Sequence, residues 1–435
     1  MKFLIYCQHT SPRLKYILDF YFEKTWQWDY TLTDSIDEFN SSHDHKISYG
    51  SKAISDEIFI YSDGLLFEDK IRDVSPDVFL WEDVKAFFKA PEEAAVPFDI
   101  FSASFYLLSR YEEYLPFKPD EHGRFSAENS FSFKNDFLND PVIDIWSFKI
   151  ASIFTKKFNI PSPSFQFTFT STIDIDNAYA FLGKGFLRTI AALGKSAVML
   201  KQNEFVDRIS VMIRRQKDPY DTYNILDRWH KNYNVKTIYF FLLGNYAQYD
   251  KNLPVNSLRL RKLIKRTSDN SLIGIHPSYN SNSNPAKMLI EKEKLEEISL
   301  HQIDNSRQHF LKLEFPGTYR SLIDIEIGND HTMGYADQIG FRAGTSREFY
   351  FYDLEREQST KLLIHPFSVM DATLNRYMKI SPDAAVYTVR PLVNKLKKYG
   401  GQFTLLWHNE TLSEMHYWKG WRDVYLQLIK IAQND

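Results

Sequence analysis

The first part of the chain alternates hydrophobic runs with a segment of helical spacing. "KFLIYC" at 2–7 and "EIFIYS" at 57–62 have the continuous apolar character of buried strands, whereas "PFDIFSASFYLLSRYEEYL" at 97–115 places apolar residues three and four positions apart. These two periodicities are typical of strands and helices, respectively. The stretch "NIPSPSF" at 159–165 has two prolines around a serine and indicates a linker. The pattern therefore predicts a small α/β domain over residues 1–160.

The same alternation continues through residues 161–435, with more strands. Six apolar runs are expected to form strands, at 165–174, 236–244, 271–278, 339–344, 361–369 and 401–409. Helical spacing is expected between them, at 219–233, 256–268, 286–303 and 384–400. Strands that are apolar throughout and alternate with amphipathic helices predict a parallel sheet covered by helices, either open or closed into a barrel.

Composition places the chain among globular proteins and excludes several classes. Apolar residues make up 43% and charged residues 25%, so long disordered segments are not expected. The net charge of −3, with scattered lysines and arginines, argues against nucleic-acid binding. The single cysteine, Cys7, excludes an internal disulfide and a cysteine-rich metal site. Aromatic residues reach 16%, which favours large buried cores over the sharper alternative of an aromatic-lined sugar groove.

Targeting signals are not evident in the sequence. The apolar run that follows Lys2 is shorter than the ~7–15 residues of a signal-peptide core. No run approaches the ~20 apolar residues of a membrane helix. The sequence therefore predicts a cytoplasmic protein without a membrane span.

Reactive side chains end four of the expected strands. The first strand runs into Asp174 and Asp176, and later strands end in His276, His365 and His408. Because ligands of parallel α/β folds bind at the carboxyl ends of the strands, we expect these side chains to share one site.

The two aspartates favour a metal site. In an extended chain Asp174 and Asp176 point the same way, and two like charges repel unless a cation lies between them or one holds a proton. His276 is the best second ligand. Carboxylate and imidazole ligands fit a divalent metal such as Zn²⁺, with Co²⁺, Mn²⁺, Fe²⁺ or Ni²⁺ as alternatives, better than Ca²⁺. The other interpretation of Asp176 is an N-cap of a following helix.

The motifs resemble those of a known family. "STIDID", "IGIHPSYN", "SRQH" and "LLWHN" follow the order and spacing of the polysaccharide deacetylases of carbohydrate esterase family 4, the nodulation-type deacetylase domain. The features "SRYEEYLPF", "DPYDTY", "GYADQIGFRAGT" and "HPFSVMDATL" are similar to a bacterial subgroup that carries this domain behind an N-terminal domain of unassigned role. The resemblance implies a distorted (β/α) barrel of the polysaccharide deacetylase type over residues 161–435, preceded by the smaller α/β domain.

The resemblance also implies a metal site. Asp174 matches the catalytic base, and Asp176 and His276 match metal ligands. The second histidine of the family's motif falls on Asn280, whose amide oxygen is a weaker ligand than imidazole. His365 is an alternative replacement ligand, or simply a histidine that closes a strand before a proline.

Three further positions match the family's catalytic apparatus. Arg307 matches the arginine that orients the base, although His309 stands where a proline is usual. Leu406 matches the leucine that lines the acetyl pocket, and His408 matches the general acid.

The remaining candidates are expected to contact substrate or to support the site. Tyr279 and Arg342 are expected to bind substrate, although Arg342 has the alternative of pairing with Asp330 or Asp353. Asp371 is expected to lie beside the site. The polar segments "SRYEEY" and "DEHGRF" of the N-terminal domain are expected to face the neighbouring cleft.

The resemblance implies a metal-dependent hydrolase that removes an N-acetyl or similar acyl group from a sugar of a polysaccharide or glycan precursor. The alternative is a catalytically inactive domain that binds glycan or acts as a partner in polysaccharide biosynthesis or export. A nucleotide enzyme is disfavoured, because no glycine-rich phosphate loop follows a strand.

Overall fold

The first hydrophobic runs form a small parallel sheet. A computed structural model describes residues 1–184, 202–282 and 284–433. Its N-terminal sheet has the strand order β2-β1-β3-β4, in which every pair is parallel. The bounds are β1 (Lys2–Tyr6), β2 (Asp29–Thr33), β3 (His45–Gly50) and β4 (Ile58–Tyr61). The inner strand β1 buries three consecutive apolar residues, as expected for a strand covered on both faces.

Helices and a short hairpin complete the N-terminal part. The helices are α1 (Pro12–Leu18), continued as a π-helix over Asp19–Trp26, α2 (Ile36–Ser41), α3 (Ile100–Leu108), α4 (Phe131–Lys134) and α5 (Val142–Phe158). The hairpin pairs β5 (Phe79–Trp81) with β6 (Val84–Ala86). The helix α3 begins at the cap Asp99, whose buried carboxylate accepts hydrogen bonds from the backbone N–H groups of Phe101 and Ser102.

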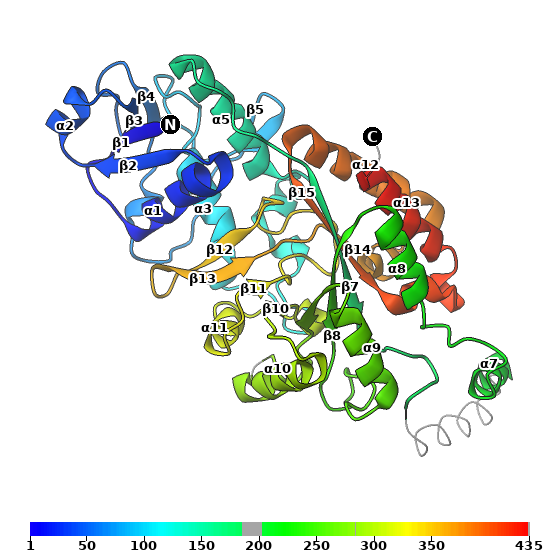
Figure 1. The fold of residues 1–435 in the computed structure, drawn as a ribbon. Helices are drawn as coiled ribbons and strands as arrows, with labels where there is room; N and C mark the ends of the chain where they lie inside the picture. Colours follow the sequence, from blue (N-terminus) through cyan, green and yellow to red (C-terminus); the bar gives the residue numbers. More distant parts are fainter. Residues whose placement is uncertain (185–201, 283, 434–435) are drawn as a thin grey trace.

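The second part of the chain is built on a nine-stranded sheet of order β12-β13-β11-β10-β9-β8-β7-β15-β14 (Figure 1). The strands are β7 (Thr168–Ile175), β8 (Lys236–Phe241), β9 (Leu272–Ile275), β10 (Asn305–Ser306), β11 (Asn329–Asp330), β12 (Phe349–Asp353), β13 (Gln358–Ile364), β14 (Val369–Met370) and β15 (Gln402–His408). Every pair is parallel except β12 with β13. The prediction of a mixed α/β fold with a mostly parallel sheet is therefore confirmed.

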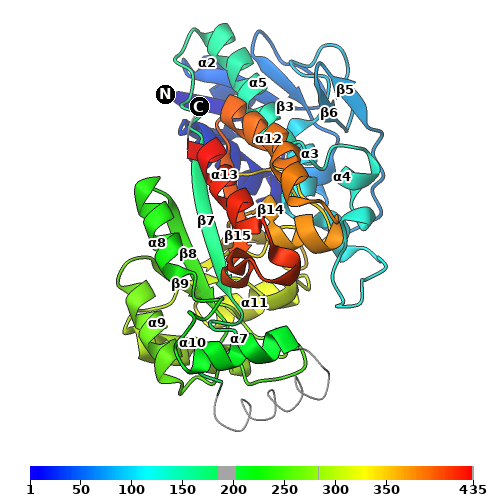
Figure 2. The same cartoon turned by 90° about the vertical axis from the view of Figure 1, so that its right-hand side faces the viewer.

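Helices follow most of these strands. They are α7 (Gln202–Met212), α8 (Tyr223–Asn232), α9 (Leu258–Ser268), α10 (Pro285–Ser299), α11 (Gly317–Asp324), α12 (Pro382–Tyr399) and α13 (Trp421–Gln433). Helices α12 and α13 pack side by side, and α12 contacts β15 (Figure 2). No helix in the described part of the chain is long and apolar enough to cross a membrane.

One expectation about the sheet is not confirmed, and another is wrong. The strand order does not close into a barrel among the described residues, because β12 and β14 are its two edges and do not pair. The strand expected at 339–344 is instead a turn, because Gly340 and Gly344 have φ of +128° and +67°, outside the extended region. The edge next to β13 is formed by β12, a few residues later.

A buried group of charges joins the two parts of the chain. Glu113, just after α3, accepts hydrogen bonds from Arg110 at 2.8 Å and from Arg342 at 2.9 Å and 2.5 Å. All three side chains are buried. Arg342 therefore pairs with Glu113 rather than with Asp330 or Asp353. Buried charges are tolerated only when they are paired, so this group ties the N-terminal part to the loop after β11.

We predict that Glu113→Gln lowers the free energy of unfolding by about 3–5 kcal/mol, because the buried Arg342 loses its carboxylate partner and Arg110 keeps only that of Glu112. The exposed pair of Glu68 with Arg72 is the control, and Glu68→Gln should cost less than about 1 kcal/mol. Urea denaturation of both variants measures this difference. Equal midpoints for the two variants would contradict the assigned role of the buried group.

Candidate active site

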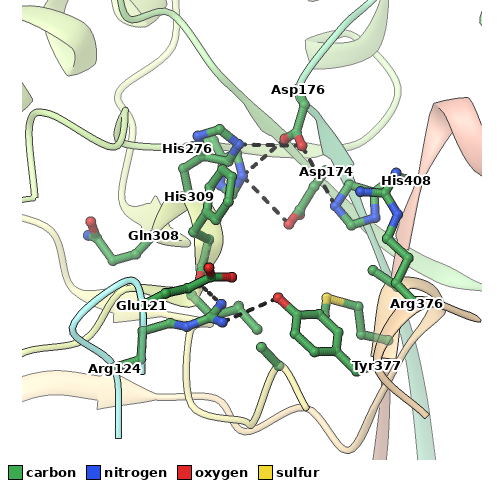
Figure 3. Close-up of a pocket in the computed structure, with 15 residues that line it drawn as sticks. Glu121, Arg124, Asp174, Asp176, His276, Gln308, His309, Arg376, Tyr377 and His408 are labelled. Atoms are coloured by element: carbon green, nitrogen blue, oxygen red, sulfur yellow. Dashed lines mark hydrogen bonds and ion pairs between the residues drawn. The ribbon is translucent and has the colours of Figure 1, made fainter. Parts of the chain in front are cut away.

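The carboxyl ends of the large sheet meet at a pocket of about 300 Å³ (Figure 3). Strands β7 and β15 pair so that Asp174 lies opposite His408, and β8 and β9 follow β7 in the sheet. Residues that line the pocket include Asp174, Asp176, His276, His309, His408 and Arg124. The pocket thus contains both aspartates and two of the three strand-end histidines that the sequence singled out.

Asp174 is held by a buried arginine. Its Oδ1 accepts a hydrogen bond of 2.9 Å from Nη1 of Arg307, which also donates to the hydroxyl of Thr172. Arg307 follows the two-residue strand β10 and donates through Nε to the carbonyl oxygen of His331. Its guanidinium lies over the ring of Phe240 at 4.6 Å. Both groups are almost completely buried, so this charge-assisted hydrogen bond fixes the direction of the Asp174 carboxylate.

Asp176, His276 and His309 form a second group. Their ligand atoms all lie within 4.8 Å of one another. The carboxylate of Asp176 is 3.2 Å from Nε2 of His276 and 3.5 Å from Nε2 of His309. Burial alone would raise the pKa of Asp176, but the surrounding histidines outweigh it and hold that pKa well below its usual range.

Hydrogen bonds on the far side of each imidazole set its orientation. Nδ1 of His276 lies 2.6 Å from the carbonyl oxygen of Arg307, and Nδ1 of His309 lies 2.9 Å from the carboxylate of Asp250. A carbonyl and a carboxylate oxygen accept only, so each Nδ1 carries a hydrogen, and each Nε2 presents a lone pair whenever it holds no proton of its own. Two lone pairs and the carboxylate of Asp176 then converge on one point, where they need a cation or added protons.

This donor set fits a divalent metal ion. One carboxylate and two imidazoles that are oriented from behind are typical of catalytic zinc sites and suit related divalent metals. Oδ1 of Asp176 is buried and faces Nε2 of His276 at 3.2 Å, with no further partner among the described residues. Burial lowers the pKa of His309, yet Asp176 and Asp250 outweigh burial and raise that pKa to about 9. The group therefore attracts positive charge even without a metal.

The turn after β10 delivers His309 to this group. Phe310 has φ 60° and ψ 12°, and Leu311 also has a positive φ of 53°. Residues other than glycine rarely adopt this backbone conformation. It costs about 1–3 kcal/mol per residue and persists only where surrounding contacts hold it. Such strained backbone is common next to functional groups.

His408 ends β15 and forms a pair with Asp371. Its Nδ1 lies 2.8 Å from Oδ1 of Asp371, which is completely buried just after β14. Burial lowers the pKa of His408, but Asp371 and then Asp176 outweigh it and raise that pKa to about 10. Its Nε2 is 3.9 Å from the carboxylate of Asp176. His408 is therefore protonated at neutral pH and directs an N–H toward the pocket.

An apolar cluster lies beside these charges. Leu406 packs in it with Leu311, Ala336, Phe367 and Met370. Leu311, Ala336 and Met370 line the pocket, whereas Leu406 is completely buried beneath it. The pocket therefore combines an apolar wall with a charged one.

Seven predicted residues do not line the pocket. Arg307, Asp371 and Leu406 contact residues that line it, whereas the other four lie farther away. Asn280 is exposed and lines a separate cavity beyond α10, and Tyr279 is half-buried at 3.4 Å from the His122 ring. Arg342 lies in the buried charge group with Glu113. His365 stacks on His331 at 4.4 Å between ring centres, in a cavity at the opposite, amino ends of the strands. The second histidine of the group is therefore His309, from a neighbouring loop, and not a residue at position 280 or 365.

Some residues of the site were not singled out from the sequence. His309 and Gln308 line the pocket, and Asp250 contacts His309 from behind. Glu121 and Arg124, which also line the pocket, belong to the segment "DEHGRF" that was expected to face the cleft. The only sequence signal for His309 was its place two residues after Arg307.

Comparisons with known proteins give distant likenesses. A family model of unknown function, DUF7033, matches residues 3–159. No curated protein matches the chain in sequence. A candidate polysaccharide deacetylase from Mycobacterium smegmatis is similar in structure over 62% of this chain and 86% of that one, with 15% identity and a TM-score of 0.40.

Two further solved structures are similar. A mutant of a CE4 family pseudoenzyme with restored enzymatic activity covers 60% of this chain and 62% of that one, with 12% identity and a TM-score of 0.28. A 7,8-dihydropteroate synthase from Vibrio fischeri covers 62% and 95%, with 9% identity and a TM-score of 0.28. These values do not assign the chain to a family, so its function has to be inferred from the pocket itself.

We predict that Asp371→Asn lowers the pKa of His408 from about 10, because burial stays and the largest opposing charge is lost. A histidine whose pKa is raised in the folded state stabilises the fold fully below about pH 6.5 and loses that contribution as the pH rises through about 10. The variant should lose this alkaline dependence. An NMR titration of the histidine ring protons measures the shift, and an unchanged pKa would contradict the role of Asp371.

Proposed function

We propose that the protein is a metal-dependent hydrolase that removes an N-acetyl or similar acyl group from a sugar of a polysaccharide or glycan precursor. The observation that carries this proposal is the convergence of Asp176, His276 and His309 between two separate acid–base groups, Asp174 with Arg307 and His408 with Asp371. The resemblance of the sequence motifs to polysaccharide deacetylases supports the same reaction.

The three ligands would hold the metal through one carboxylate oxygen and two Nε2 atoms. When bound, a divalent cation supplies a Lewis acid for the acyl carbonyl and for the attacking water. The apolar wall of Leu311, Ala336 and Met370 accepts the methyl group of the acyl chain and excludes bulk water.

Two side chains divide the proton transfers. The carboxylate of Asp174 is fixed by Arg307, and it accepts the proton of the attacking water. His408 is protonated at neutral pH and donates its Nε2 proton to the departing nitrogen. A base and an acid of opposite charge in one pocket are what hydrolysis of an amide requires.

The alternative of an inactive glycan-binding domain was based on the missing motif histidine at Asn280. His309 supplies an imidazole to the same group from another loop, which removes the reason for that alternative. We therefore favour the enzyme.

We predict that His309→Ala and Asp176→Ala each lose the bound metal, whereas Asn280→Ala keeps it. The first two variants remove an atom from the converging group, and the third changes an exposed side chain outside it. Elemental analysis of protein loaded with zinc and then desalted measures the metal content. Stoichiometric zinc in His309→Ala would contradict this assignment, as would loss of zinc in Asn280→Ala.

We also predict that Asp174→Asn retains the metal and releases acetate from an N-acetylated oligosaccharide roughly 10²–10⁴-fold more slowly, because the amide cannot accept the proton. Zinc content and initial rates are measured on the same preparation. Thr404→Ser, a conservative change on the neighbouring strand β15, serves as the control and should turn over normally. Full activity of Asp174→Asn would exclude Asp174 as the base.

A further inference from the structure

One wall of the pocket comes from the N-terminal part of the chain. Residues 120–125 form a turn that is closed by its own hydrogen bonds. Oδ1 of Asp120 accepts the backbone N–H groups of His122 and Arg124, both at 2.9 Å, and Oδ2 accepts Nε of Arg124 at 2.7 Å. Gly123, at φ +78°, provides the left-handed residue that the turn requires. The turn is therefore shaped independently of any ligand, and it lies within the span that matches a family of unknown function.

Arg124 links this turn to two loops of the large sheet. Its Nη1 donates to the carbonyl oxygen of Phe310 at 2.7 Å, and its Nη2 donates to the hydroxyl of Tyr377 at 3.2 Å. The Arg124 side chain is only 8% exposed. In Figure 3 it crosses the lower side of the pocket between Glu121 and Tyr377. A planar guanidinium with all three of its nitrogens engaged is a rigid connector.

The same turn contacts Phe310 a second time. The ring of His122 packs against the ring of Phe310, with centres 4.7 Å apart. Phe310 is the residue directly after His309, and it has the left-handed backbone conformation described above. Its carbonyl and its ring are thus both held by the N-terminal part of the chain.

Contacts on either side of residues 120–125 attach this segment to the second part of the chain. The backbone N–H of Ala127 donates to the carboxylate of Asp337 at 3.2 Å, and the buried group of Glu113 and Arg342 lies farther along the same interface. The N-terminal part is therefore anchored to the large sheet on both sides of residues 120–125.

We propose that the N-terminal part of the chain is a working part of the active site, in which Arg124 is a positioning residue that clamps the His309–Phe310 turn. The proposal rests on the proposed function for its effect on the metal, and on geometry alone for its effect on the turn. The clamp holds the strained backbone that directs Nε2 of His309 at Asp176. It also closes one side of the pocket, so the N-terminal part shapes the space available to the sugar.

The test compares Arg124→Gln with Arg72→Gln in the full-length protein. Arg72 is an exposed residue of the same part of the chain, and its side chain pairs only with Glu68 among the interactions of the described residues. Hydrogen–deuterium exchange on metal-free protein reads the backbone of residues 308–313. We expect faster exchange there in Arg124→Gln and unchanged exchange in β1, whereas Arg72→Gln should match the wild type in both.

The second measurement is zinc affinity, by competition with a chromophoric chelator. Contacts that orient a ligand typically change metal affinity by about 10–100-fold, and we expect a loss of this size in Arg124→Gln. Arg124→Lys keeps one donor for the Phe310 carbonyl and should recover part of the affinity. Tyr377→Phe loses a contact of Arg124 that does not involve Phe310 and should bind zinc nearly as the wild type does. In turnover, kcat should fall more than KM rises, because the clamp acts on the metal ligand.

The two proposals fail in different ways. Wild-type exchange at residues 308–313 in Arg124→Gln would overturn the clamp, whether or not the protein binds zinc. A wild-type protein that binds no zinc and releases no acetate would overturn the proposed function, while the exchange result would still decide the clamp. If Arg124→Gln exchanges faster everywhere, including β1, Arg124 only stabilises the fold and the clamp is also overturned.

Discussion

Asp174 and Asp176 leave one strand two residues apart and face the same pocket, and the rest of the site supplies each carboxylate with partners of its own. Like charges in a buried place raise each other's pKa unless each has its own counter-charge. Asp174 pairs with the guanidinium of Arg307, and a guanidinium is not deprotonated in a protein. Asp176 is surrounded by the imidazoles of histidines, which can lose a proton. This difference separates a carboxylate suited to proton transfer from one suited to a metal.

The three imidazoles differ in the group that contacts their Nδ1 atom. His276 is backed by a carbonyl oxygen, His309 by the carboxylate of Asp250 and His408 by that of Asp371. The first two direct their Nε2 atoms at Asp176 from one side, while His408 approaches from the strand β15 on the other. The two proposed metal ligands, His276 and His309, and the proposed acid, His408, thus surround the carboxylate of Asp176. The buried charges between the two parts of the chain hold that geometry from outside the pocket.

The apolar runs of the sequence predicted the residues at the ends of β7, β9 and β15, whereas His309, which follows the two-residue strand β10, was missed. The apolar runs of β7, β9 and β15 are long enough to show a pattern, and the residues at their ends, Asp174, Asp176, His276 and His408, meet in the pocket. Strand β10 has only two residues, so no periodicity marked His309 as a strand-end histidine. Arg124 acts on a residue 186 positions later, which no local pattern reveals. The resemblance implied a barrel, whereas the described residues form an open sheet with β12 and β14 at its edges. Whether two edge strands pair depends on the tertiary structure, so no local sequence pattern predicts it.

In the proposed site one cation binds Asp176, His276 and His309 together. Anomalous diffraction at the zinc edge, from crystals of the zinc-loaded protein, locates that cation. We expect a single strong peak about 2.0–2.2 Å from one carboxylate oxygen of Asp176 and from Nε2 of both histidines. A peak coordinated by Asn280 or His365 instead, or no peak at this end of the sheet, would contradict it.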